Sequence, residues 1–401
     1  MIGPTAFTRF RTRLPFEFGL PTFDGRFRQA SDGGAYYLCR NDTLLASLRQ
    51  ATPPMRLSEG GGFSCLPRRL WGGTEFAGRR VLFVLPSSAI GDCVGVHLFL
   101  KSFRTRWPTA EVAVLNSGAA TDLFALEPAV TLFPLFLSET QHKRWRTVVD
   151  LGEMEGWGGI ATSPIDAETV LLDAFGLSPC PAELAGRPVP AEPRSAILPL
   201  ASSPLRSLPP RLTAALARAL AAKGPVTVLL NGWQGLSRAY EAALRPLLSE
   251  GITVNGGFRA TGQLMDFIAG CGYVVVADSG PAHLTKLAGT PGTAIYTSAG
   301  HQVLQGRFRN LTPWQSRFAG PHCTAPCGLA KLRRAADGRV GCMGSLGLPL
   351  EELPGLPGED AALAARLVLE TPVPCVAALT DAADAVAAFI IEDVERRRND
   401  P

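Results

Sequence analysis

Long apolar runs are missing from this sequence of 401 residues. No segment approaches the roughly 18–20 apolar residues of a membrane-spanning helix, and residues 1–21 lack the apolar core of a secretory signal. We therefore expect a cytoplasmic protein without a transmembrane segment, either free in the cytoplasm or peripheral at the inner membrane.

Lysine is scarce as well, since only five of the 39 basic residues are lysines. The formal net charge is +4, and the basic residues form no block that alternates with aromatic ones. This argues against nucleic acid as a partner. The excess of arginine over lysine is typical of a GC-rich genome, and scattered arginines would also suit an anionic substrate.

Neither disorder nor a disulfide framework fits the composition. The sequence is 46% apolar and 18% charged, which is normal for a globular protein, and it is long enough for two domains and an additional segment. In a reducing cytoplasm, the nine cysteines are expected to be free thiols or metal ligands before disulfides.

The pattern of strands and helices divides the chain. Residues 1–78 are rich in Gly, Pro, Arg and aromatic residues and have no helical period, so we expect a small β-rich or irregular extension. After it, apolar strands alternate with helical segments, which predicts an α/β protein with parallel sheets. A proline-rich hinge at 181–193 separates a domain at 79–190 from a second one at 191–375.

The segment 272–299 predicts strand, tight turn, helix and strand. Its β-branched run ends in Asp-Ser-Gly-Pro at 278–281, where proline suits the first helical turn and the aspartate or the serine can cap the helix. A helix that starts at the carboxyl end of a parallel strand binds anions, so a phosphate fits here, with His283 as a donor. The alternative is a plain strand–helix connection with a solvent-facing histidine.

Asp-Ser-Gly-Pro-Ala-His-Leu at 278–284, followed by Ala-Gly-Thr-Pro at 288–291, resembles the donor-site signature of the ADP-heptose:lipopolysaccharide heptosyltransferases, glycosyltransferase family 9. The likeness runs from about Arg80 to the C-terminus. It implies a GT-B fold, in which two Rossmann-like domains face a cleft, here with the β-rich N-terminal extension. It also implies an acceptor-side domain at 79–190, a donor-binding domain at 191–375 and a C-terminal helix, 376–401, that packs back on the acceptor-side domain.

Asp92 is the expected catalytic base. It closes Ser-Ser-Ala-Ile-Gly-Asp at 87–92, just past an expected strand at 81–85, and resembles the segment ending in Gly-Asp that opens the heptosyltransferases. An inverting sugar transfer needs a carboxylate that takes the proton of the attacking hydroxyl. A helix cap is the alternative role for this aspartate.

The resemblance also assigns the donor diphosphate to the second domain. Arg206 stands where the family has a basic residue that contacts the donor phosphates, although Ser-Leu-Pro follows it here in place of Trp-Pro. A solvated arginine is the alternative. The expected donor-binding set is Arg206, Asp278, Ser279, Gly280, Pro281, Ala282 and His283, with Asp278 supporting the turn.

Four cysteines stand near the C-terminus, namely Cys323, Cys327, Cys342 and Cys375. Four thiolates suit tetrahedral zinc or iron, with His322 as a substitute ligand. The N-terminal extension and these cysteines resemble the iron-containing heptosyltransferases that modify bacterial autotransporter adhesins. We expect a structural iron or zinc ion and no cofactor for the chemistry, with unligated reduced thiols as the alternative.

The resemblance thus implies an inverting glycosyltransferase, which moves a heptose or a similar sugar from a nucleotide diphosphate donor, ADP-heptose, to a hydroxyl. The acceptor would be an autotransporter protein or the lipopolysaccharide core, and the enzyme could form a homo-oligomer. Two rivals stay open. One is a GT-B-shaped binding or assembly protein without turnover, and the other is a GT-B nucleotide-sugar epimerase, for which the sequence offers only five histidines.

Overall fold

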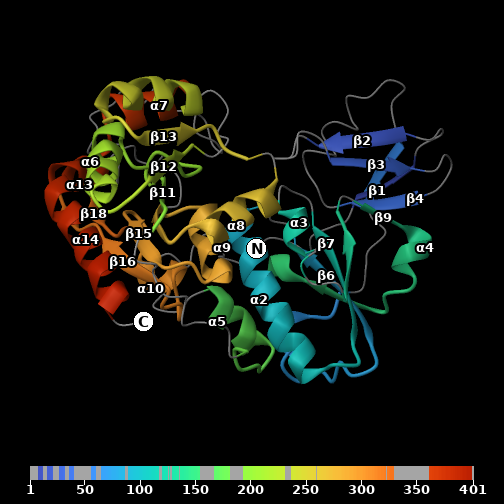
Figure 1. The fold of residues 1–401 in the computed structure, drawn as a ribbon. Helices are drawn as coiled ribbons and strands as arrows, with labels where there is room; N and C mark the ends of the chain where they lie inside the picture. Colours follow the sequence, from blue (N-terminus) through green and yellow to red (C-terminus); the bar gives the residue numbers. More distant parts are fainter. Residues whose placement is uncertain are drawn as a thin grey trace. The chain divides into compact units, whose positions relative to one another are not determined.

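A computed structural model gives the fold of this chain. It describes residues 8–11, 16–20, 27–31, 36–39, 56–59, 65–85, 89–116, 120–124, 126, 129–134, 136–153, 167–180, 193–230, 236–258, 260–321, 323–328 and 361–399. The chain forms two compact units, which are drawn in Figure 1 and described one at a time. The first unit comprises Met1–Glu155, Glu168–Cys180 and Arg259–Gly262, and the second comprises Gly156–Ala167, Pro181–Phe258 and Gln263–Pro401.

The first unit begins with a small antiparallel sheet, which confirms the β-rich extension. Its strand order is β5-β1-β4-β9, and a separate hairpin joins β2 to β3. The strands are β1 (Thr8–Arg11), β2 (Phe16–Leu20), β3 (Phe27–Ser31), β4 (Tyr36–Cys39), β5 (Arg56–Glu59) and β9 (Phe136–Ser138). Strand β9 comes from outside the expected extension, and its Phe136 packs against Phe10 and Tyr37 with ring centroids 5.5 and 4.9 Å apart. This pairing ties the extension to the α/β part of its unit.

A parallel sheet of order β10-β6-β7-β8 follows in the same unit (Figure 1). Its strands are β6 (Arg80–Leu85), β7 (Glu111–Asn116), β8 (Val130–Phe133) and β10 (Thr147–Asp150). The helices are η1 (Arg68–Leu70), α2 (Ile90–Arg106), α3 (Thr121–Phe124), α4 (Glu139–His142), η2 (Leu151–Glu153) and α5 (Ala167–Ala174). Strand β6 is buried from Val81 to Leu85, because its apolar run lies between two strands and beneath aromatic side chains such as Phe99 and Phe175.

The second unit holds a six-stranded parallel sheet of order β13-β12-β11-β14-β15-β16. Counted along the chain, this is the Rossmann order 3-2-1-4-5-6. The strands are β11 (Ser195–Leu198), β12 (Val226–Leu229), β13 (Ile252–Asn255), β14 (Tyr273–Ala277), β15 (Gly292–Tyr296) and β16 (Leu311–Gln315). Two parallel sheets and the extension confirm the expected α/β class with Rossmann-like units.

In the second unit, a helix follows each strand from β11 to β15 along the chain. The helices of this unit are α6 (Pro210–Ala221), α7 (Leu236–Leu244), η4 (Arg245–Leu247), α8 (Thr261–Gly270), α9 (Gly280–Ala288), α10 (His301–Leu304), α12 (Ala361–Leu369), α13 (Pro374–Asp381) and α14 (Ala383–Asn399). A short antiparallel pair, β17 (Phe318–Ala319) and β18 (Thr324–Ala325), completes the described part.

One helical stretch, Ala362–Asp381, has the length and composition of a membrane span, and 44% of it is buried. Inside the second unit, Leu367, Val373 and Val376 of this stretch pack in one core cluster with Leu205. Its apolar residues therefore serve as protein core here.

Helix α14 packs against α6 and β15 of the second unit (Figure 1). Its Val386, Ile390 and Val394 belong to the core cluster of that sheet, in keeping with the expected apolar stripe. The expectation that this segment also packs on the acceptor-side domain stays a prediction.

A buried carboxylate fixes α14 to the sheet. Asp393, which is 3% exposed, accepts hydrogen bonds from the Tyr273 hydroxyl and the Thr312 hydroxyl, each at 2.7 Å. Arg397 Nε donates to it at 2.9 Å, and Arg396 also donates to it. Burial raises the pKa of Tyr273 well above its ordinary value, with Asp393 adding to the shift, so the phenol stays protonated and donates.

We expect Asp393→Asn to lower the free energy of unfolding by about 3 kcal/mol, because it leaves the Arg397 guanidinium without its anion in a mostly buried position. Chemical denaturation of the full chain measures the change. Glu392→Gln, on the exposed neighbouring residue, is the control and should change stability by less than about 0.5 kcal/mol. Equal stability of the two variants would contradict the role of Asp393.

Candidate functional site

The second sheet has one point where its strand order reverses, between β11 and β14. These strands are parallel neighbours, with Leu198 beside Val276, so their carboxyl ends lie together. In open α/β sheets, ligands bind in the crevice at such a reversal. The segment after β11 carries Arg206 and the turn after β14 carries Asp278, so two residues expected from the sequence flank this point.

The turn after β14 and the start of α9 form as predicted, with one difference in the cap. Ser279 occupies the N-cap position of α9, but its hydroxyl donates to the Ala277 carbonyl at 3.0 Å and does not cap the helix. Pro281 lies in the first turn, where its missing N–H costs nothing. The helix ends at Gly289, whose φ of 62° is the left-handed conformation that glycine adopts without strain.

Ala282 belongs to the expected donor-binding set, but its backbone amide is bonded within the chain. It donates to the Ser279 carbonyl at 3.0 Å, inside the tight first turn, so it is already used and is not free to bind a phosphate. For the Gly280 amide, the described residues supply no acceptor. The Ser279 amide likewise has no acceptor among the described residues, so the Ser279 and Gly280 amides are the open backbone donors at this helix start.

Arg206 reaches the turn from a well-tied loop. Ser203 anchors this loop by accepting from the Arg206 and Ser207 amides at 3.2 Å. The Arg206 side chain, 15% exposed, donates through Nη1 to the Asp278 carbonyl at 3.1 Å and lies 3.5 Å from its Oδ1. Its Nη2 donates to the Ser202 hydroxyl at 3.0 Å. The arginine is therefore held at the reversal point and is not a solvated surface residue.

Asp278 is buried with one oxygen unsatisfied. It is 1% exposed, and no donor within the described part of the chain reaches its Oδ2. Burial raises the pKa of this carboxyl, while the charges of Arg206 and Lys286 act in the opposite direction. A buried acceptor without a partner costs about 1–3 kcal/mol, and a ligand hydroxyl that reached it would remove that cost.

His283 sits on the first turn of α9 and is held neutral. Burial, followed by the charges of Lys286 and Arg206, keeps its pKa well below the ordinary value. The Lys286 ammonium lies 3.3 Å from Nδ1 and can only donate, so Nδ1 accepts and the ring proton is on Nε2. A neutral His283 therefore offers one N–H donor through Nε2.

Lys286 is a member of this cluster that the sequence analysis did not name. It is only 7% exposed, donates to the Leu304 carbonyl and lies 5.4 Å from the centre of the Phe308 ring. Its spacing of three residues from His283 was the available signal, because residues three apart share a helix face. With Arg206, it places two cations beside the single carboxylate of Asp278, so the cluster has a net positive charge that favours an anion.

Asp92 belongs to the first unit. It is half-buried in the first turn of α2, directly after β6. The first sheet reverses its strand order between β10 and β6, so Asp92 follows a strand that borders that reversal. Asn116 at the end of β7 braces this edge by donating to the Leu85 carbonyl at 3.2 Å.

Three of the four candidate metal ligands lie in the described part of the chain, and Cys342 lies outside it. Burial raises the pKa of Cys375 to about 12, and the charges of Cys327 and Cys323 add to the shift. Within the residues that the structure describes, no three His, Cys, Asp or Glu side chains are placed to hold one ion. The three cysteines alone do not make a ligand set, and His322 also lies outside the described residues.

Comparison with known proteins identifies a family domain within the chain. Residues 172–325 match the model of glycosyltransferase family 9 (heptosyltransferase), a span that includes Arg206 and the whole turn after β14 and is shorter than the likeness expected from Arg80 onward. No curated protein matches the sequence.

Solved structures of heptosyltransferases resemble this one at low identity. The E. coli heptosyltransferase WaaC with ADP is 15% identical over 58% of this chain and 92% of that one, with a TM-score of 0.42. The iron-containing dodecameric glycosyltransferase TibC from enterotoxigenic E. coli H10407 is 12% identical over 98% of this chain and 92% of that one, with a TM-score of 0.48.

TibC in complex with ADP-D-β-D-heptose has the same identity and coverage, and a TM-score of 0.50. At this identity the similarity concerns the fold, and it extends over the N-terminal extension as well as both Rossmann-like units. The fold is thus of the GT-B type. Together with this fold, the match at 172–325 indicates a glycosyltransferase that carries a glycosyltransferase family 9 (heptosyltransferase) domain at those residues.

Proposed function

We propose that this glycosyltransferase transfers a heptose, or a similar sugar, from ADP-heptose to a hydroxyl with inversion at the anomeric carbon. The observation that supports the donor most directly is the positive cluster at the strand reversal of the second sheet, where Arg206 and Lys286 lie beside one carboxylate. A diphosphate is the anion that such a cluster and an adjoining helix start bind best. WaaC and TibC, which have this fold, have been solved with ADP and with ADP-D-β-D-heptose.

The donor diphosphate would bind Arg206, the Gly280 amide and the Nε2–H of His283. Ser279 and Pro281 shape the turn, and Asp278 holds Arg206 while its open oxygen accepts from a sugar hydroxyl. A neutral histidine suits this place, because it donates a hydrogen bond to the leaving phosphate without a change in its own charge.

Asp92 would act as the base. The acceptor oxygen forms a bond to the anomeric carbon as its proton passes to the Asp92 carboxylate. The bond between that carbon and the phosphate oxygen breaks, and the nucleoside diphosphate leaves with the electron pair toward the donors described above. General-base assistance of this kind is worth about 10²–10⁴-fold in rate.

The acceptor we propose is a serine of an autotransporter protein, with the lipopolysaccharide core as the second candidate. The similarity to TibC over 98% of the chain, extension included, favours the first, since the similarity to WaaC covers 58%. We place the enzyme in the cytoplasm, free or peripheral at the inner membrane, and propose a homo-oligomer because TibC is dodecameric.

A structural metal ion held by Cys323, Cys327, Cys342 and Cys375 is part of the proposal. TibC contains iron. Burial raises the pKa of Cys375, and a soft cation would stabilise its thiolate, since metal binding favours the deprotonated form. The ion would hold the C-terminal segment together and would take no part in the transfer.

A panel of nucleotide sugars tests the donor. ADP-heptose at about 100 times its dissociation constant should stabilise the full chain by roughly 2.7 kcal/mol, measured as a thermal shift, while UDP- and GDP-sugars should not. Product analysis with each acceptor then separates transfer from epimerisation. Stabilisation by none of the panel would argue against the proposed donor.

Asp92→Asn should lower the transfer rate by at least about 10²-fold and leave the affinity for ADP unchanged, because the base meets the acceptor and not the diphosphate. Single-turnover rates and ADP titrations measure the two effects. Asp173→Asn, on an exposed aspartate of the same unit, is the matched control. A rate within tenfold of wild type would remove Asp92 from the mechanism.

Arg206→Gln should weaken ADP binding by about 10- to 150-fold, the equivalent of one charge-assisted hydrogen bond of roughly 1.5–3 kcal/mol. His283→Gln should act less than additively with it if both side chains contact one phosphate. Arg211→Gln carries the same charge change at an exposed site of α6 and should bind as wild type does. The assignment fails if Arg206→Gln and Arg211→Gln have the same affinity for ADP.

Protein purified without a metal-affinity resin should contain about one iron or zinc ion per chain, and Cys375→Ser should lose it. Cys180→Ser, in the first unit, should retain it. Chelation should lower the melting temperature because the ion stabilises the segment. Elemental analysis that finds little iron or zinc in the wild type would reject the site.

A further inference from the structure

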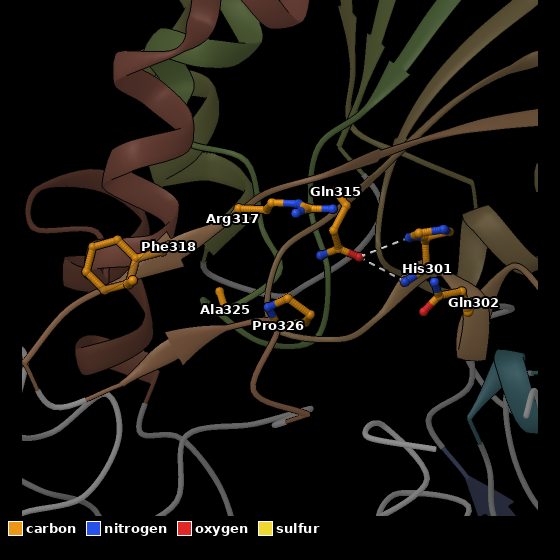
Figure 2. Close-up of a pocket in the computed structure, with 8 residues that line it drawn as sticks. His301, Gln302, Gln315, Arg317, Phe318, Ala325 and Pro326 are labelled. Atoms are coloured by element: carbon orange, nitrogen blue, oxygen red, sulfur yellow. Dashed lines mark hydrogen bonds between the residues drawn. The ribbon is translucent and has the colours of Figure 1, made fainter. Parts of the chain in front are cut away.

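A pocket of about 480 Å³ lies beside the carboxyl ends of β15 and β16, in the second unit (Figure 2). Its size is within the range of small-ligand sites. It is lined by His301, Gln302, Gln315, Arg317, Phe318, Ala319, Ala325 and Pro326. None of these residues belongs to the donor-side cluster, so the pocket has no role in the function proposed above.

Gln315 determines which ring nitrogen of His301 carries the proton. Its Oε1 accepts from the His301 backbone amide at 2.9 Å, and its Nε2 lies 3.3–3.4 Å from the carbonyls of Tyr296, Thr297 and Ala299. A backbone N–H can only donate and a carbonyl can only accept, so the amide has one consistent orientation.

Oε1 of Gln315 also lies 3.3 Å from Nδ1 of His301, and a dashed line in Figure 2 marks this contact. Nδ1 must therefore carry the proton, and in the neutral ring Nε2 is left as an acceptor. This is the reverse of His283, where the proton is on Nε2. His301 is prepared to accept a hydrogen bond from a hydroxyl group.

The charge of the pocket is positive and is not neutralised by its lining. Arg317 is exposed, and within the described part of the chain it forms no ion pair and no Asp or Glu lines the pocket. A guanidinium in that position favours a carboxylate or a phosphate, which it can hold with two parallel hydrogen bonds.

Apolar groups complete the lining. Phe318, Ala325 and Pro326 come from the β17–β18 pair and the residue after it. Phe318 also packs against the core cluster that contains Leu205 and Val376, which holds this side of the lining in place. An apolar wall of this kind suits the C–H face of a sugar, while the planar amides and the imidazole can bond its hydroxyls. The lining would therefore recognise a ligand that has hydroxyl groups, an apolar face and one anionic group.

We propose that this pocket binds an acidic saccharide, whose carboxylate or phosphate pairs with Arg317 and one of whose hydroxyls donates to Nε2 of His301. The strands β14, β15 and β16 are parallel neighbours, so the pocket opens at the same edge of the sheet as the turn at Asp278. The proposal concerns binding and does not depend on the transfer reaction or on its donor.

Histidine side-chain NMR of the full chain tests it, because five histidines give few signals and His301→Gln identifies those of His301. In the free protein, the ¹⁵N shifts of His301 should be those of a ring protonated at Nδ1. Glucuronate and glucose 6-phosphate are the two probes, one for each anionic group, with glucose and inorganic phosphate as the neutral and the sugar-free references.

Glucuronate or glucose 6-phosphate should shift the His301 signals, and Arg317→Gln should weaken that binding by at least about tenfold. Arg309→Gln, an exposed arginine that does not line the pocket, should leave it unchanged. Arg206→Gln should also leave it unchanged, which separates this pocket from the proposed diphosphate site.

Three results would overturn the proposal. The first is that neither acid shifts His301. The second is that glucose or inorganic phosphate acts as strongly as the acids do, so that the sugar and the charge are not recognised together. The third is that Arg206→Gln abolishes binding while Arg317→Gln does not, which would place the saccharide in the donor-side cluster.

Discussion

The contact of Arg206 with Asp278 joins the two strands at which the second sheet reverses its order. One residue follows β11 and the other follows β14, and these strands are adjacent although 72 residues separate the pair. Because the carboxylate is buried, the guanidinium cannot leave without exposing an unpaired charge to a low-dielectric interior. The start of α9, the open amide of Gly280 and His283 are all placed relative to this contact, so the proposed anion site depends on it.

Local signals in the sequence were sufficient for the strand, turn and helix around this contact. The β-branched run of β14, the proline in the first turn and the glycine that ends α9 each act within a few residues, so their pattern predicts the element directly. Gly292 shows what such local patterns cannot predict. A Cβ at this position would lie 2.1 Å from the Val274 carbonyl oxygen, a constraint that only the neighbouring strand imposes.

What the sequence did not predict depends on distant contacts. Strand β9 has three residues and pairs with β4 nearly 100 positions earlier, so no local pattern marks it. The side chain of Ser279 turned to the Ala277 carbonyl, which changed the expected cap, and the amide of Ala282 was used within the helix. The proton positions on His283 and His301 follow from Lys286 and Gln315, partners that only the folded chain identifies.

The contacts that stabilise the second sheet and the residues of the two proposed sites lie at opposite edges of that sheet. Asp393 bonds Tyr273, the first residue of β14, and Thr312 near the start of β16, while Tyr273 also shares a hydrogen bond of 2.7 Å with Thr293 near the start of β15. All three contacts are at the amino edge, where α14 holds the strands in register. The carboxyl edge, which carries the turn at Asp278 and the pocket at Arg317, is thereby free to hold unpaired donors and acceptors, because the strands that bear them are fixed from the other end.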